Sequence, residues 1–270
     1  MPDGNSEATM CLSLKKYLDT GLYSDLRIKD SDGHEYAVHR ILVCGQSPVL
    51  ENACKPGSGF KDDETQELTL VPSAVQEAQS GVVDLKDDDP SAVKAMLEFM
   101  YRGTFTIPGD AVSPILFAVR AYIIADIYAV SNMKKIATAK FSELASVNYK
   151  NPNFVTALRV IYESAQDNDK GCMRETAVDI VSKHYDLLLA NSAFEAVLDD
   201  HGALGKDILR ALLRKANAPK AAKYMCRHGG RIEQFVEMII DHGHPHNKSS
   251  CINCNISLSN NEWKKRMVVT

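Results

Sequence analysis

The residues best suited to chemistry in this 270-residue chain gather near its C-terminal end. The segment 226–254 contains three of the seven cysteines and four of the eight histidines. Cys251 and Cys254 form a Cys-x-x-Cys pair, which sets two thiolates within one tight turn and suits tetrahedral Zn²⁺. Cys226 and His228 supply the other two ligands of the predicted site. The clustering therefore predicts one structural zinc ion in this tail.

Alternatives to this ligand set, and to zinc itself, remain open. One residue separates Cys226 from His228, which is an unusual spacing, so His242 and His244 are substitutes for the first pair. A redox Cys-x-x-Cys normally begins a helix after a strand of a thioredoxin-like unit, and the sequence has no recognisable unit of that kind. The other possibilities are a disordered tail with incidental histidines and a helical hairpin with unliganded thiols. A catalytic zinc is disfavoured, because no carboxylate base accompanies the cluster.

The segment that separates the cysteines is predicted to be a helix. Arg231–Asp241 carries apolar residues at helical spacing, which would form one apolar stripe: Ile232, Phe235, Val236, Ile239 and Ile240. One amphipathic helix is too small to bury a core of its own, so a unit of this kind usually needs a metal or a disulfide. A reducing compartment argues against the disulfide.

The overall composition indicates a globular protein of a reducing compartment. Hydrophobic residues make up 45% of the chain and charged residues 24%, and the length suggests one to three domains. No stretch approaches the ~20 apolar residues of a membrane span. Met1–Met10 lacks the basic and apolar regions of a secretory signal. The remaining cysteines are scattered singly among apolar neighbours, a pattern typical of reduced, buried thiols. They are Cys11, Cys44, Cys54 and Cys172. We therefore expect a location in the cytoplasm, the nucleus or both, and no membrane partner.

Charge is distributed unevenly along the chain. Residues 1–202 carry 19 Lys and Arg against 30 Asp and Glu, whereas residues 203–270 carry 12 against 5. A basic tail raises the question of nucleic-acid binding. We favour a solvated basic face, because no aromatic or Gly-rich RNA-binding signature accompanies the charge. Nucleic acid is therefore not the expected partner.

Turn and capping signals divide the chain into short elements. Ser or Asp followed by Pro predicts the start of a helix, Asp32-Gly33 predicts a hairpin turn, and glycines predict helix ends. Ser192 and Glu195 have the spacing of a capping box. The predicted helices are Met10–Thr20, a segment from Pro48 to about Cys54, Ser91–Tyr101, 113–127, 131–145 and everything from Asn151 on; the predicted strands are Asp25–Lys29, Glu35–Val38, Val82–Leu85 and Thr104–Ile107.

No motif for catalysis is recognisable in the sequence. Gly-x-Ser-x-Gly, a phosphate-binding Walker loop and His-Glu-x-x-His are all missing. The carboxylates of Asp62–Glu64 and Asp87–Asp89 are adjacent in sequence, in predicted loops or caps, where solvated charge explains them better than an acid–base pair. We therefore expect a protein that is not an enzyme.

Several motifs, in order over about 120 residues, resemble a BTB/POZ domain of the form common in fungal proteins. The motifs are Ser24-Asp25-Leu26, Val38-His39-Arg40 with Leu42 and Ser47, Val83 and Leu85 with Asp87–Pro90, Ala92-Val93, Met96-Leu97, Met100–Gly103, and Ala121-Tyr122 with Ala125-Asp126 and Tyr128. The resemblance covers less than half of the chain. It departs from the family at Glu64–Gly81, which looks like an insertion.

The resemblance implies an α+β fold, in which a small sheet is capped by helices and followed by an all-helical extension and a short zinc-binding tail. The expected divisions are an N-terminal helix and tail, the BTB/POZ-like domain, the helical extension and the Cys/His-rich tail: residues 1–21, 22–146, 147–218 and 219–270.

The resemblance also implies a homodimerising adaptor that binds other proteins. Leu14 and Leu18 belong to the apolar face of the first helix, which we expect at the dimer interface. The positions of Asp25 and Arg40 face a charged pocket near that interface in the family, so the two residues should lie close together in a charge-assisted contact.

A narrower role within the family is that of a substrate adaptor for a cullin-3 ubiquitin ligase. Such adaptors often carry a hydrophobic-x-Glu element after the second helix pair, and the nearest match here is Phe60 with Asp62 in place of Glu. The alternatives are a transcription-linked nuclear scaffold and a nucleic-acid-binding protein that uses the basic tail. No separate domain that would recognise a client is visible in the sequence.

Overall fold

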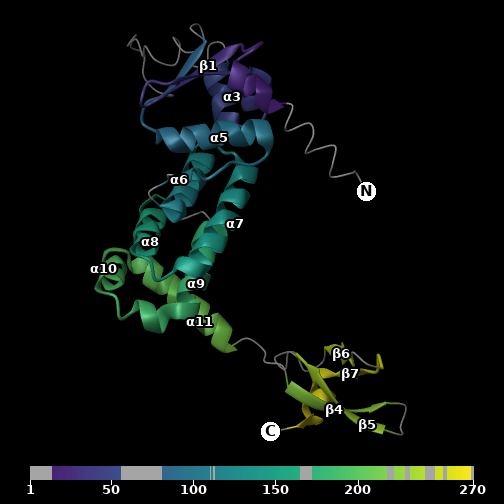
Figure 1. Ribbon diagram of the computed structural model, residues 1–270. Coiled ribbons are helices and arrows are strands. Elements are labelled where there is room, and N and C mark those ends of the chain that lie inside the picture. Colours follow the sequence, from purple (N-terminus) through teal and green to yellow (C-terminus); the bar gives the residue numbers. More distant parts are fainter. Residues whose placement is uncertain are drawn as a thin grey trace, which may run out of the picture. The chain divides into compact units, whose positions relative to one another are not determined.

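The computed structural model describes residues 14–55, 81–109, 111, 113–164, 172–217, 222–228, 232–240, 247–251 and 254–268. The chain forms two compact units, Met1–Ile208 and Leu209–Thr270. Figure 1 shows the helices that dominate the first unit and the short strands that dominate the second.

A three-stranded mixed sheet begins the first unit. Its strands are β1 (Leu26–Asp30), β2 (Glu35–Val38) and β3 (Val82–Leu85), in the order β2-β1-β3. The first two pair antiparallel around a turn in which Gly33 has a φ of +85°, a conformation that favours glycine. β3 pairs with β1 in parallel, from Arg27 opposite Val82. The predicted hairpin is confirmed, and the parallel strand joins it across the long segment after α3 (Pro48–Cys54).

Helices accompany this sheet in the first unit, and three of them begin at a Ser or Asp cap. Besides a helix at residues 14–20, they are α2 (Arg40–Val43), α3, α5 (Pro90–Arg102), α6 (Pro114–Ile127) and α7 (Ser131–Asn148). Ser47, Asp89 and Ser113 each accept a backbone N–H at the start of a helix, with Pro at the next position. The predicted strand Thr104–Ile107 is wrong, because these residues form an irregular segment after Gly103, which ends α5 at φ +69°.

Three more helices and the start of a fourth extend the first unit, as expected, and the rest of the fourth belongs to the second unit. They are α8 (Pro152–Ser164), α9 (Cys172–Leu188), α10 (Ser192–Asp200) and α11 (Gly202–Asn217). α8 packs on α6, α9 and α10, and the stacked rings of Phe141 and Phe154, 6.4 Å apart, join α7 to α8. The cap of α10 lies one residue before the predicted one, because the side chain of Asn191 accepts the N–H of Ala193.

The second unit contains short strands where the sequence predicted helix. β4 (Ala222–His228), β5 (Ile232–Met238) and β8 (Met267–Val268) form one sheet in the order β5-β4-β8. β6 (Lys248–Ser250) and β7 (Ser257–Ser259) form a hairpin, and α12 (Asn260–Lys264) follows it. The predicted helix at Arg231–Asp241 is therefore wrong, as is the expectation that everything from Asn151 on is helical.

The error at this segment has a physical reason. The apolar residues that fit a helical stripe fit an alternating pattern as well, and burial decides between the two. Met238 and Ile240 are buried, whereas Ile239 between them is 65% exposed, which is the period of extended backbone. Tyr224 and Cys226 alternate inward in the same way on the facing strand. Pairing with β4 along the whole of β5 outweighs any local preference for helix.

Candidate interaction face and thiol cluster

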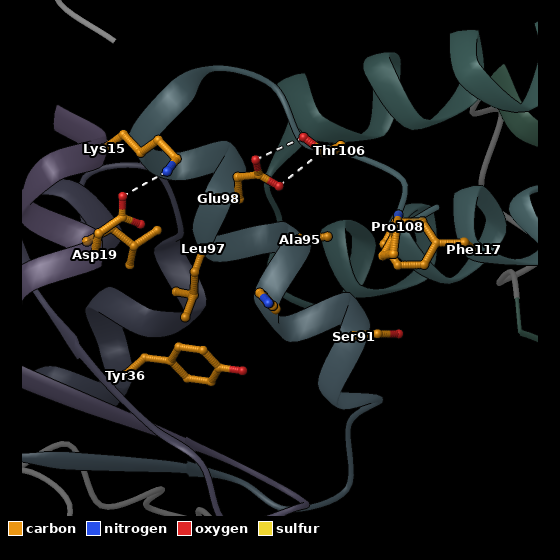
Figure 2. Close-up of a pocket in the computed structure, with 12 residues that line it drawn as sticks. Lys15, Asp19, Tyr36, Ser91, Ala95, Leu97, Glu98, Thr106, Pro108 and Phe117 are labelled. Atoms are coloured by element: carbon orange, nitrogen blue, oxygen red, sulfur yellow. Dashed lines mark hydrogen bonds and ion pairs between the residues drawn. The ribbon is translucent and has the colours of Figure 1, made fainter. Parts of the chain in front are cut away.

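The helix at residues 14–20 forms one wall of a pocket in the first unit. The pocket has a volume of about 520 Å³, and its apolar lining includes Leu18, Leu97 and Phe117 (Figure 2). Leu14 and Leu18 are both half-buried within the single chain. Polar contacts surround the apolar lining: Lys15 Nζ lies 2.7 Å from Asp19 Oδ2, and Glu98 accepts the backbone N–H of Thr106 at 2.9 Å. An apolar floor with a charged rim is suited to binding protein surfaces.

Asp25 and Arg40 lie close together, and their contacts run from side chain to backbone. The Asp25 carboxylate accepts the backbone N–H of Arg40 at 2.8 Å, at the start of α2. The Arg40 guanidinium instead donates to two backbone carbonyls, those of Asp25 at 3.3 Å and Cys54 at 3.1 Å. Each side chain thus bonds to backbone, and the guanidinium of Arg40 in α2 contacts the residue before β1 and the last residue of α3.

His39 and Tyr101 also contact each other in this region, a pairing that the sequence did not predict. The backbone N–H of His39 donates to the Tyr101 hydroxyl at 2.9 Å, and His39 Nδ1 lies 2.7 Å from the same oxygen. His39 Nε2 lies 2.8 Å from the carbonyl oxygen of Leu22. Both His39 and Tyr101 belong to the motifs quoted above, but nothing in either motif indicates that they meet across the fold.

The residues expected to contact cullin-3, Phe60 and Asp62, lie outside the described residues. The same is true of the predicted insertion Glu64–Gly81, apart from Gly81 itself. The carbonyl of Gly81 accepts the N–H of Arg27 at 2.9 Å and begins the pairing of β3 with β1.

Three cysteines meet in the second unit. The sulfur atoms of Cys226, Cys251 and Cys254 all lie within 4.8 Å of one another, and those of Cys226 and Cys254 are 3.5 Å apart. Tetrahedral Zn–S bonds of ~2.3 Å would hold sulfurs about 3.8 Å apart. The three thiols therefore have the spacing of a metal site, and they could bind a metal ion. We call them the thiol cluster.

Two different hairpins supply the thiol cluster. Cys226 lies on β4, whereas Cys251 and Cys254 lie in the turn between β6 and β7. That turn is closed by hydrogen bonds from Cys251 N–H to Ile256 O and from Asn255 N–H to Cys251 O, both 2.9 Å. Asn255 has a φ of +59°, a conformation that Asn adopts more readily than most residues. The predicted Cys-x-x-Cys turn thus brings its two sulfurs to a third from a distant strand.

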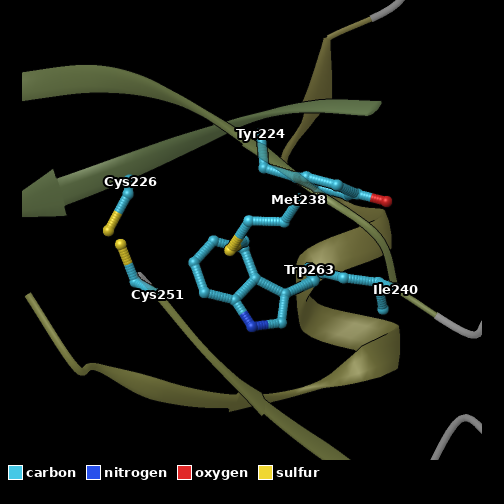
Figure 3. Packing of buried hydrophobic residues seen from close by; sticks show 6 residues of the cluster. All are labelled: Tyr224, Cys226, Met238, Ile240, Cys251 and Trp263. Atoms are coloured by element: carbon cyan, nitrogen blue, oxygen red, sulfur yellow. The ribbon is translucent and has the colours of Figure 1, made fainter. Parts of the chain in front are cut away.

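The thiol cluster lies in a small apolar core. Figure 3 shows Cys226 and Cys251 beside Tyr224, Met238, Ile240 and Trp263. The Trp263 ring packs edge-on against Tyr224 at 5.9 Å, and its Nε1 donates to the Ser249 carbonyl at 2.8 Å. Burial raises the pKa of the Cys226 thiol to about 12, and the thiols of Cys254 and Cys251 add to the rise. A bound divalent cation has the opposite effect, because it stabilises thiolates.

The histidines predicted as ligands are only partly placed. His228 is the last residue of β4, opposite Ile232, and its side chain is outside the described part of the structure. His242 and His244 also lie outside the described residues. The structure therefore brings together the three cysteines of the predicted set and leaves the fourth ligand open.

Comparison with known proteins identifies the first unit. A protein-family model for the BTB/POZ domain matches residues 14–143, which include the sheet, the pocket and the contacts of Asp25 and Arg40. A search of curated proteins found no match. Within the described ranges, no helix combines the length and the apolar composition that crossing a bilayer requires. The order of the motifs, the fold that they form and the family match agree, and we conclude that this chain contains a BTB/POZ domain, a protein-interaction module that often dimerises, at residues 14–143.

Proposed function

We propose that this protein is an adaptor that forms a homodimer through its BTB/POZ domain and binds other proteins. The observation that carries the proposal is the match of residues 14–143 to a family of protein-interaction domains. The helix at residues 14–20 supports it, because Leu14 and Leu18 stay half-exposed on a single chain. Association with a second copy would remove this apolar surface from water.

Light scattering on the full chain tests the homodimer. We expect twice the chain mass of 29.8 kDa, and a shift toward the monomer on Leu14→Glu with Leu18→Glu. Lys16→Glu is the control, because Lys16 is exposed on the same helix and its change alters charge without removing an apolar side chain. A clean wild-type monomer at about 50 μM, where even weak specific contacts form, would overturn the proposal.

The narrower proposal is a substrate adaptor for a cullin-3 ligase. Its support is the family and the element Phe60–Asp62, in which Asp stands where such adaptors often have Glu. Titration calorimetry with the cullin-3 N-terminal domain should give saturable binding that Phe60→Ala weakens by about tenfold or more. If the protein does not bind the cullin-3 N-terminal domain, the role as a cullin-3 adaptor is excluded, and a scaffold role is favoured.

Nucleic-acid binding through the basic tail is the alternative from a different class of function. Its support is the excess of Lys and Arg, 12 against 5 acidic residues, in residues 203–270. If the tail binds nucleic acid, its affinity for a random oligonucleotide should fall steeply as the salt concentration rises. Replacing Lys and Arg of the tail by neutral residues should make this salt dependence less steep. Binding that is weak at low salt would remove this alternative.

We also propose one structural zinc ion in the thiol cluster and a reducing location, the cytoplasm or the nucleus. Soft thiolate ligands select zinc among the common divalent ions. None of the five cysteines whose state the structure describes forms a disulfide, although the sulfurs of Cys226 and Cys254 are only 3.5 Å apart. Free thiols at such short range are what a reducing compartment maintains.

A further inference from the structure

Among the described side chains of the second unit, the core around the thiol cluster is small. It contains four large apolar side chains, with Leu258 packed against them: Tyr224, Met238, Ile240 and Trp263. Units of about 60 residues or fewer are marginal on hydrophobic burial alone and usually depend on a metal, a disulfide or a partner. The described cysteines of this unit form no disulfide.

The two hairpins of this unit also belong to separate sheets. β4 and β5 pair with β8, whereas β6 and β7 pair only with each other in the part of the unit that the structure describes. Their contacts include the Trp263 ring of α12, which follows the second hairpin and packs against Tyr224 of β4, and the meeting of Cys226 with Cys251 and Cys254. An ion bound to all three sulfurs would therefore cross-link one hairpin to the other.

Position 228 is suited to complete the ligand set. Successive residues of a strand point to opposite faces, so the positions of Cys226 and His228 share one face of β4. A histidine nitrogen and three thiolates form a common tetrahedral site for zinc.

We propose that the zinc ion folds the second unit, with Cys226, Cys251, Cys254 and His228 as its four ligands. The inference rests on the zinc proposed above and adds what the ion does. Without it, the two hairpins are held by one small core. With it, binding free energy becomes folding free energy, because an unfolded chain has no preformed site.

The chain contains its own reporter for this proposal. Trp263 is the single tryptophan of the sequence, and it is fully buried in the core of the second unit. Its fluorescence in the full-length protein therefore reports on this unit alone. The helices of the first unit dominate the far-ultraviolet circular dichroism, which serves as an independent probe of that unit.

The experiment removes zinc from the full chain under reducing conditions. Elemental analysis of protein purified without chelator should give about one zinc per chain. Chelation should shift Trp263 emission to longer wavelength and leave the helical signal almost unchanged, and added Zn²⁺ should reverse the shift. If zinc is present but its removal leaves the Trp263 emission unchanged, the ion binds without folding the unit, and only the folding role is overturned. Less than roughly a tenth of an equivalent of zinc would overturn both.

Variants test the ligand set. Cys251→Ser with Cys254→Ser should abolish zinc binding, whereas Cys44→Ser, a half-buried cysteine of the first unit, should leave it intact. His228→Ala should weaken zinc binding by more than about tenfold, which is the scale of loss that changes at a metal site produce. His242→Ala and His244→Ala should have little effect. If zinc affinity falls in His242→Ala or His244→Ala and stays unchanged in His228→Ala, then His228 is not a ligand. None of these outcomes depends on the oligomeric state, which light scattering measures separately.

Discussion

At the scale of single residues, hydrogen bonds from side chains to backbone hold the first part of the BTB/POZ domain together. The Asp30 carboxylate, fully buried, accepts the N–H groups of Asp32 at 3.1 Å and His34 at 2.9 Å and the Tyr36 hydroxyl at 2.9 Å. Asp25 and Arg40 likewise bond to backbone groups. Such bonds fix the hairpin and the start of α2 in one geometry, next to the face proposed for dimerisation.

The side chains of Asp25 and Arg40 should contribute to stability independently. Each contacts the other's backbone, which either substitution leaves in place. In a double-mutant cycle of Asp25→Ala and Arg40→Ala, we expect each change to cost about 1 kcal/mol and the coupling to stay below about 0.5 kcal/mol. Urea unfolding measures all four proteins. A coupling well above about 1 kcal/mol would indicate a direct ion pair instead.

Asp30 should make stability depend on pH in the acid range. Burial by itself would raise the pKa of Asp30, but the hydrogen bonds from the His34 N–H and the Tyr36 hydroxyl outweigh it, and the pKa is lowered. A carboxyl with a lowered folded-state pKa stabilises the protein above its unfolded value and loses that contribution as the pH falls. At pH 7, Asp30→Asn should cost about 2 kcal/mol.

The control for Asp30 is the pH dependence of the same variant. The difference in unfolding free energy between wild type and Asp30→Asn should shrink as the pH falls below about 4. Exposed Asp32→Asn should not change the acid dependence appreciably. A difference between wild type and Asp30→Asn that stays constant down to pH ~2 would mean that the carboxylate charge is not responsible.

At the scale of elements, caps connect helices as well as begin them. Ser47 accepts the N–H of Leu50 at 3.1 Å to start α3, and its hydroxyl donates to the Tyr128 carbonyl at 2.6 Å, just after α6. Ser113 starts α6 with a bond from the Leu116 N–H at 3.3 Å. The first cap therefore links two helices whose starts, Pro48 and Pro114, are 66 residues apart in sequence, whereas the second acts on its own helix.

This difference predicts unequal costs for two similar substitutions. Ser113→Ala should lower the unfolding free energy by about 1 kcal/mol, the usual value of a helix cap. Ser47→Ala should lower it by about 2 kcal/mol, because it also removes a buried hydrogen bond. Urea unfolding followed by circular dichroism compares the two. Equal losses would show that the bond to Tyr128 contributes nothing measurable.

At the scale of the whole molecule, the two compact units should unfold in separate transitions. The first has a large core of helices and a sheet, whereas the described core of the second is small, and we have proposed that zinc at the thiol cluster stabilises it. Urea unfolding curves measured by circular dichroism and by Trp263 fluorescence should have different midpoints. The whole chain therefore should not unfold as a two-state system. Chelation should move only the fluorescence curve. Coincident curves with and without chelator would contradict this picture.

The sequence by itself determined the local features of this protein. Ser47-Pro48 and Asp89-Pro90 predicted helix starts, and Asp32-Gly33 predicted the hairpin, because caps and turns depend on interactions between neighbouring residues. The ordered motifs predicted the BTB/POZ domain, and the spacing of Cys251 and Cys254 predicted a turn that holds two thiols.

Only the tertiary structure decided which distant partners meet. Ile232–Met238 is a strand because β4 pairs with it along its whole length, although its apolar spacing also fits a helix. Cys226, on β4, completes the thiol cluster, and the Arg40 guanidinium binds backbone carbonyls instead of the Asp25 carboxylate. Short-range periodicity cannot distinguish such outcomes, because they depend on burial and pairing between segments that come together only when the chain folds.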